Sequence, residues 1–135
     1  MSTKIFINLP VKDLPKSMEF FRALGFTFNP QFTDETAACM VISEDIYSML
    51  LTEEKFKDFT PKPICDARKC TEVLVALTRE SREAVDALVA KAVAAGGGTY
   101  KEPPDHGFMY AYGFQDLDGH IWEPFWMDPS AIQQN

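Results

Sequence analysis

The sequence predicts an α+β fold in which two tandem βαβββ modules form a curved sheet around a cup-shaped cavity. The chain has 135 residues, of which 46% are hydrophobic and 13% aromatic, enough for one domain with a real core. The order strand, helix, three strands occurs twice, with a period of about 65 residues that matches no solenoid repeat. Each half alone has too little core to be stable, so the two halves are expected to share one cavity. The predicted domain spans residues 1–135, with module one at about 1–59, a linker at about 60–70 and module two at about 71–128.

The first module is read from apolar runs separated by turn residues. Its helix is predicted at residues 17–24, because Asp13 or Leu14 is a suitable N-cap, Pro15 suits the first helical turn, and Gly25 suits the end of a helix. The predicted strands are residues 5–11, 26–32, 37–42 and 46–52, with a short helix at 53–59.

The second module follows the Pro-rich linker at residues 60–63. Its helix is predicted at residues 81–95, with an apolar stripe, Ser81 as N-cap and the triple glycine 96–98 as its end. The predicted strands are residues 72–77, a short 99–101, 108–114 and 121–126.

Composition excludes some classes of partner. The net charge is -7 and no Lys/Arg cluster interrupts it, so nucleic-acid binding is not expected. No stretch has the length of a membrane span and no signal-peptide pattern is present, so we expect no membrane partner. The three cysteines lack metal-type spacing and are read as reduced thiols, which predicts a cytoplasmic protein.

The most informative stretch is DLDGHIWEPFW at residues 116–126, a tight Asp-Gly turn followed by a strand. Alternation puts Ile121, Glu123 and Phe125 on one face of that strand. A carboxylate on an otherwise apolar face is costly to bury unless a partner, a proton or a metal compensates it. Glu123 is therefore the first candidate for chemistry, and the alternative is an edge strand whose Glu faces water.

The chain resembles the vicinal oxygen chelate superfamily, which includes glyoxalase I, bleomycin-resistance proteins and extradiol dioxygenases. The resemblance is carried by NLPVKDLPKS at residues 8–17, by the following FF and LGF at 20–21 and 24–26, and by DLDGHIWE at 116–123. It covers nearly the whole chain and implies a glyoxalase/bleomycin-resistance/dioxygenase-like domain. Members are commonly dimers, so a homodimer is expected.

The family's enzymes commonly bind a divalent metal through ligands on the first and fourth strands of each module. The resemblance places these positions on Phe6 and Leu50, whose side chains cannot bind a metal, and on Glu72 and Glu123. A slip of one residue would put Thr71 in place of Glu72. The metal site is therefore expected to be incomplete, with no certain cofactor; a divalent metal held by the two glutamates is the alternative.

Two glutamates facing one cavity permit three arrangements. They hold a hard cation such as Mg²⁺, they share a proton as an acid/base pair, or each bonds to local donors without doing chemistry. His106 lies on a loop flanked by Pro and Gly and is a candidate general base or ligand donor. The candidate catalytic residues are thus Glu72, His106 and Glu123.

Ligand-binding residues are predicted on the strands that would line the cup. Phe6, Asn8 and Leu50 are expected there from module one. Tyr110 and Tyr112 share one face of their strand and would supply aromatic walls with hydroxyl groups. If that face packs on the helix instead, Met109, Ala111 and Gly113 line the cup.

Two functions remain. The first is a protein that binds a small organic molecule without transforming it, as the resemblance to the bleomycin-resistance branch implies. The second is a metal-dependent or carboxylate/His-based lyase, isomerase or dioxygenase acting on a small metabolite. The missing ligands at Phe6 and Leu50 favour the first, and the carboxylate pair favours the second.

Overall fold

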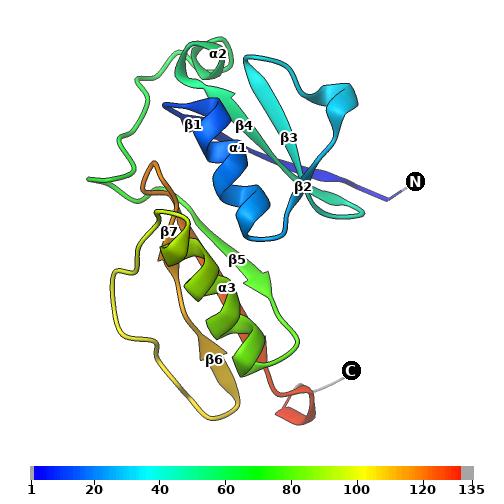
Figure 1. Ribbon diagram of the computed structural model, residues 1–135, viewed down its shortest axis with the longest axis vertical. Helices are drawn as coiled ribbons and strands as arrows, with labels where there is room; N and C mark the ends of the chain where they lie inside the picture. The colour runs from blue at the N-terminus through cyan, green and yellow to red at the C-terminus, as the bar shows by residue number, and fades with distance from the viewer. Residues whose placement is uncertain (1, 132–135) are drawn as a thin grey trace. The chain divides into compact units, whose positions relative to one another are not determined.

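The computed structural model describes residues 2–131, and the chain divides into two units, Met1–Asp66 and Ala67–Asn135 (Figure 1). Met1 and residues 132–135 lie outside the described part. Each unit has one sheet and one long helix, in the order predicted from the sequence.

The sheet of unit 1 has the strand order β1-β4-β3-β2. β1 and β4 are parallel, whereas the other neighbours are antiparallel. The elements are β1 (Ile5–Val11), α1 (Leu14–Ala23), β2 (Thr27–Phe28), η1 (Pro30–Phe32), β3 (Ala37–Ser43), β4 (Ile46–Thr52) and α2 (Glu53–Lys57).

Local sequence determines where α1 begins and ends. The Asp13 side chain caps it by accepting a hydrogen bond from the Lys16 backbone N–H at 3.1 Å, and Pro15 stands in the first turn. Gly25 follows the helix with φ 103°, a conformation that suits glycine. The helix buries Phe20 and Phe21.

Strand pairing shows which residues of unit 1 share a face. Leu9, Leu50 and Ala38 form one row across β1, β4 and β3, and Leu50 is 0% exposed. Phe6 and Asn8 alternate with Leu9 and therefore lie on the other face, where both are exposed. The prediction that Leu50 shares a face with Phe6 and Asn8 is wrong, because the register differs by one residue from the one assumed and Met49 stands opposite Asn8.

The sheet of unit 2 is built around β8. β5 pairs with β8 in parallel, while β6 and β7 pair with it antiparallel. The elements are β5 (Leu74–Thr78), α3 (Arg82–Ala94), β6 (Met109–Ala111), β7 (Phe114–Gln115), β8 (Ile121–Met127) and η2 (Pro129–Ala131). Since β8 has partners on both sides, the alternative that Glu123 lies on an edge strand is wrong.

Several element boundaries differ from the prediction. The strand expected at 26–32 is reduced to two residues, because Pro30 lacks an N–H and the Asn29 side chain instead accepts from the Gln31 N–H in a 3₁₀ turn. The strand expected at 72–77 begins at Leu74. The strand expected at 108–114 is interrupted at 112–113, and 99–101 forms no strand, although Gly98 bridges to β7.

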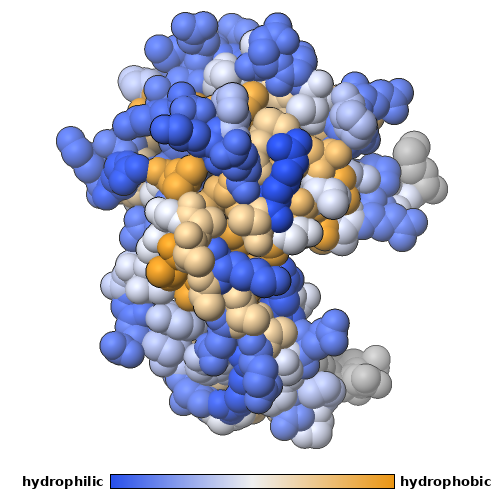
Figure 2. Space-filling model, viewed as in Figure 1, coloured by the Kyte–Doolittle hydropathy of each residue, from blue (hydrophilic) through white to orange (hydrophobic). Residues whose placement is uncertain are grey.

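Figure 2 shows a surface that is hydrophilic over most of the visible face, with hydrophobic residues gathered in patches. None of the helices within residues 2–131 has the length and apolar character needed to cross a membrane.

Candidate functional site

The sheet of unit 2 has one face packed on α3 and one open face. Val75 and Trp122 pair with each other and are buried, and Trp122 is 0% exposed. Leu74, one residue from Val75, is 55% exposed. This confirms the predicted alternation of β8, in which Glu123 lies opposite to Trp122. The open face carries Leu74 and Ala76 from β5, Met109 and Ala111 from β6, and Ile121, Glu123, Phe125 and Met127 from β8.

Glu123 is thus a half-buried carboxylate on a mostly apolar face. Ala76 stands opposite it on β5, and Ile121 and Phe125 flank it along β8. Among residues 2–131, no ion pair to Glu123 is found. Such a carboxylate favours a partner that supplies hydrogen-bond donors or positive charge.

The chain beyond α3 brings Tyr100 to this face. Gly98 and Gln115 exchange two backbone hydrogen bonds, of 2.7 and 3.1 Å, so residues 98–100 run beside β7. In this register Tyr100 lies opposite Gly113, and Gly113 lies opposite Glu123. The three positions therefore form one row across the sheet.

Gly113 makes this arrangement possible because it has no side chain. A Cβ there would lie 2.7 Å from Cζ of Tyr100, and closer still to its hydroxyl oxygen. The phenol thus occupies the space that a Gly113 side chain would fill. Burial raises the pKa of Tyr100, and the negative charge of Glu123 raises it further. The sequence prediction missed Tyr100, although a glycine inside a strand pattern is a signal of close approach.

The structure does not bring the three candidate catalytic residues together. Glu72 is exposed in the segment before β5 and lies four residues before Ala76, the neighbour of Glu123. Four residues of extended chain span about 13 Å, too far for the two carboxylates to share a proton or one cation. On β5 the neighbour of Glu123 is thus Ala76, and the pairing of Glu72 with Glu123 stays a prediction.

His106 also lies away from Glu123. Its backbone N–H donates to the Met109 carbonyl at 3.0 Å, and Met109 pairs with Met127. Met127 is four residues beyond Glu123 on β8, again about 13 Å along the strand. His106 is exposed in a turn whose Gly107 carbonyl accepts a hydrogen bond from the Arg82 guanidinium at 2.7 Å.

Tyr110 and Tyr112 lie on the α3 side of the sheet rather than on the open face. The Tyr110 hydroxyl donates to the Asp86 carboxylate of α3 at 2.6 Å. Burial, together with this hydrogen bond, raises the pKa of Tyr110 to about 12. The Tyr112 backbone N–H donates to the Pro124 carbonyl at 3.1 Å. Because Tyr112 is two residues after Tyr110, its side chain lies on the same face. The face with Tyr110 and Tyr112 thus packs toward the helix, which was the alternative prediction. Met109, Ala111 and Gly113 belong to the open face.

Phe6 and Asn8, which were both predicted to line the cavity, lie on the open face of the unit 1 sheet. Phe6 stacks on Tyr47 with ring centroids 4.7 Å apart, and the Asn8 amide donates to the Phe6 carbonyl at 3.2 Å. Lys4 lies over the other ring of this pair, that of Tyr47.

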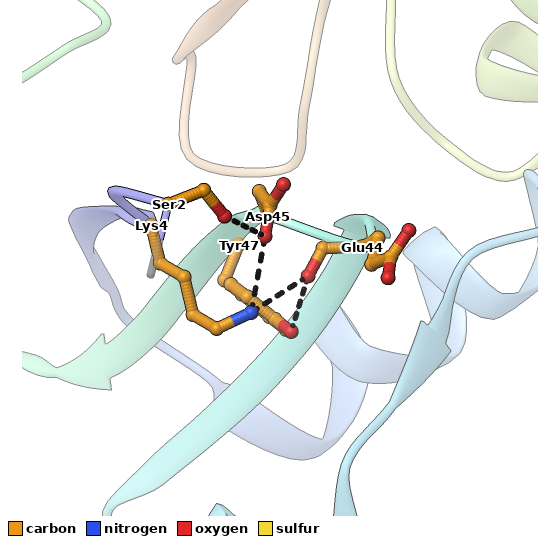
Figure 3. Close-up of polar contacts among 5 residues, drawn as sticks. All are labelled: Ser2, Lys4, Glu44, Asp45 and Tyr47. Atoms are coloured by element: carbon orange, nitrogen blue, oxygen red, sulfur yellow. Dashed lines mark hydrogen bonds and ion pairs between the residues drawn. The ribbon is translucent and has the colours of Figure 1, made fainter.

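Polar groups at this end of β1 satisfy one another (Figure 3). Lys4 pairs with the Asp45 carboxylate at 3.1 Å and also donates to the Glu44 carbonyl, which accepts the Tyr47 hydroxyl as well. Ser2 donates to Asp45. The cluster joins the start of β1 to the turn before β4 and pairs the charge of Lys4 with that of Asp45.

The donor set for a metal is poor. Within the described range 2–131, no group of three or more His, Cys, Asp and Glu side chains is placed to hold a metal ion. The buried carboxylate of Asp116 is committed to its own turn, where it accepts from the Trp122 indole and from two backbone N–H groups. Phe6 and Leu50, at two of the four ligand positions that the resemblance implies, have side chains that cannot coordinate a metal.

Two βαβββ modules with open sheet faces, the second ending in an Asp-Gly turn and a strand that carries a glutamate, define the class of glyoxalase and bleomycin-resistance-like folds. The fold and the likenesses that follow are consistent with the vicinal oxygen chelate superfamily. Residues 3–43 match the family model described as bleomycin resistance protein-like N-terminal.

Solved structures extend this likeness over the whole fold. A hypothetical protein, SA1046 from S. aureus, is 32% identical, with 93% of this chain and 94% of that chain covered and a TM-score of 0.78. A glyoxalase/bleomycin resistance protein/dioxygenase family enzyme from Burkholderia phytofirmans PsJN is 16% identical over 93% and 99%, with a TM-score of 0.76. The fosfomycin resistance protein FosX from Listeria monocytogenes is 19% identical over 96% and 97%, with a TM-score of 0.69. No curated protein sequence matches the chain significantly.

Proposed function

We propose that the protein binds a small organic molecule on the open face of the unit 2 sheet, with Glu123 as its polar anchor. The observation that carries this proposal is a carboxylate that has no ion-pair partner among residues 2–131 and is set among apolar and thioether side chains. Binding sites for small molecules combine such an apolar lining with a few polar groups that orient the ligand. Relatives named for resistance to bleomycin and fosfomycin, both small organic molecules, lend support.

The enzyme alternative has less support from the geometry. A lyase, isomerase or dioxygenase that used Glu72, His106 and Glu123 needs these groups within hydrogen-bond reach of one reacting centre. Glu72 lies four residues before Ala76, and His106 is bonded to Met109, whose partner Met127 is four residues beyond Glu123, so each is about 13 Å from Glu123 along the chain.

The test is a thermal-shift screen of the purified full chain against a library of small organic molecules. Compounds that raise the melting temperature are then measured with Glu123→Gln and with the matched control Glu72→Gln. We expect Glu123→Gln to lose most of the shift, because the amide replaces an acceptor-only, charged group with a neutral one. Glu72→Gln should keep it. Hits that bind Glu123→Gln as well as the wild type would show that the site lies elsewhere.

We also propose that the protein is a cytoplasmic homodimer. Edge strands β1 and β5 expose the apolar side chains of Ile5 and Leu74, which a second copy would cover. Sedimentation velocity at several concentrations tests the dimer, and a mass of one chain at every concentration would contradict it. Fractionation of cells that express the tagged protein tests the location.

A further inference from the structure

We propose that Tyr100 and Glu123 act together to select ligands that carry a protonated amine next to an apolar body. This inference rests on the proposed binding function and adds both a residue and a ligand class to it.

The first step is the placement of the two oxygen-bearing groups. Tyr100, Gly113 and Glu123 occupy one row across the sheet, and the phenol lies over Gly113. Directly opposite residues on one face have Cβ positions about 5 Å apart. The Tyr100 phenol and the Glu123 side chain therefore lie on one face of the sheet, near enough for the carboxylate charge to act on the phenol. From these positions, one donor group of a ligand can contact both oxygens.

The second step is what these groups accept. An ionised carboxylate only accepts hydrogen bonds, and a phenol oxygen both accepts and donates. An ammonium group has three N–H donors and a positive charge, so it can satisfy both oxygens at once. A ligand carboxylate would instead place a second negative charge beside Glu123, in a chain whose net charge is already -7.

The third step concerns the rest of the ligand. Phe125 and Ala76 flank Glu123, and Ala111 lies opposite Phe125. This surface suits an aromatic or aliphatic body, and the Phe125 ring can also face the cation.

A purely structural role for Tyr100 makes a different prediction. An aromatic ring laid over a strand glycine stabilises the sheet by covering it, and a phenylalanine would do the same. Only a binding role requires the hydroxyl, so Tyr100→Phe separates the two. Tyr47→Phe is the matched control, because its hydroxyl bonds to the Glu44 carbonyl in unit 1.

The experiment is an NMR titration of the ¹⁵N-labelled full chain with three probes of similar size: 2-phenylethylamine, 2-phenylethanol and 3-phenylpropionate. We expect the amine to bind about tenfold more tightly than the alcohol and the carboxylate to bind most weakly. Tyr100→Phe should weaken amine binding about tenfold, as expected for one lost hydrogen bond to a charged group. Tyr47→Phe should bind the amine like the wild type.

Gly113→Ala is a second, independent variant that leaves both binding side chains in the sequence. Its methyl group would occupy the site of the Tyr100 phenol and displace it, so we expect the same loss of amine binding. Dispersed amide spectra show whether each variant is folded.

The outcomes separate this inference from the proposed function. If Tyr100→Phe binds the amine like the wild type while Glu123→Gln does not, the role of Tyr100 is overturned and the binding site stands. If the alcohol or the carboxylate binds as tightly as the amine, the ligand class is overturned. If none of the probes binds, the proposed amine class is also overturned. The proposed binding function is tested separately by the thermal-shift screen.

Discussion

Replacing the buried carboxylate of Asp116 should cost far more stability than replacing an exposed one with equally many hydrogen bonds. Asp116 is 5% exposed and accepts from the Trp122 indole N–H at 3.0 Å, the Asp118 N–H at 2.9 Å and the His120 N–H at 3.0 Å. It thereby joins the turn to the start of β8, the strand that carries Glu123.

The magnitude follows from what Asp116→Ala leaves behind. The Trp122 ring is 0% exposed, so its N–H loses its partner, and water has little access to replace it; an unsatisfied buried donor costs about 1–3 kcal/mol. The two backbone donors lose bonds of about 1 kcal/mol each, which water partly replaces. Burial raises the pKa of Asp116, and removing that buried charge offsets part of the loss. We expect a net loss of about 2–3 kcal/mol in the free energy of unfolding.

The matched control is Asp34→Ala. Asp34 also accepts three hydrogen bonds, from the N–H and hydroxyl of Thr36 and the N–H of Ala37, but it is exposed. Water can satisfy those donors after the substitution, so the loss should be clearly smaller. Urea denaturation followed by far-ultraviolet circular dichroism measures both variants. Equal losses for the two substitutions would refute the argument that burial of the Trp122 bond determines the cost.

Two further predictions test the assignment of faces. Leu50→Ala should lower the free energy of unfolding by about 2–5 kcal/mol, because Leu50 is fully buried. Met49→Ala, on the open face, should lower it by much less. Similar losses for the two variants would show that the strand register is wrong. Tyr110 should titrate at about 12 in an absorbance titration at 295 nm, and Asp86→Asn should lower this value; an ordinary value in the wild type would contradict the packing against α3. Because the folded pKa of Tyr110 is raised, its contribution to stability is fully present below pH 10 and is lost as the pH rises through about 12; solvent screening at this partly exposed site limits it to about 1 kcal/mol.

The sequence alone determined the features that depend on neighbouring residues. Asp13 and Ser81 cap α1 and α3 as predicted, and the Asp118-Gly119 turn is present, with Gly119 at φ 91°. Glu123 lies on the predicted face of β8, because side chains alternate along a strand whatever its partners are.

Only the tertiary structure decided which faces of different strands lie together. Leu9 and Leu50 are 41 residues apart, and nothing local sets their register, so an error of one residue moved Leu50 to the wrong face. The same register places Ala76, not Glu72, beside Glu123. Tyr100 shares a face and a row with Glu123 because Gly98 pairs with β7. This pairing is made by backbone hydrogen bonds between distant segments and is therefore not visible in the order of the residues.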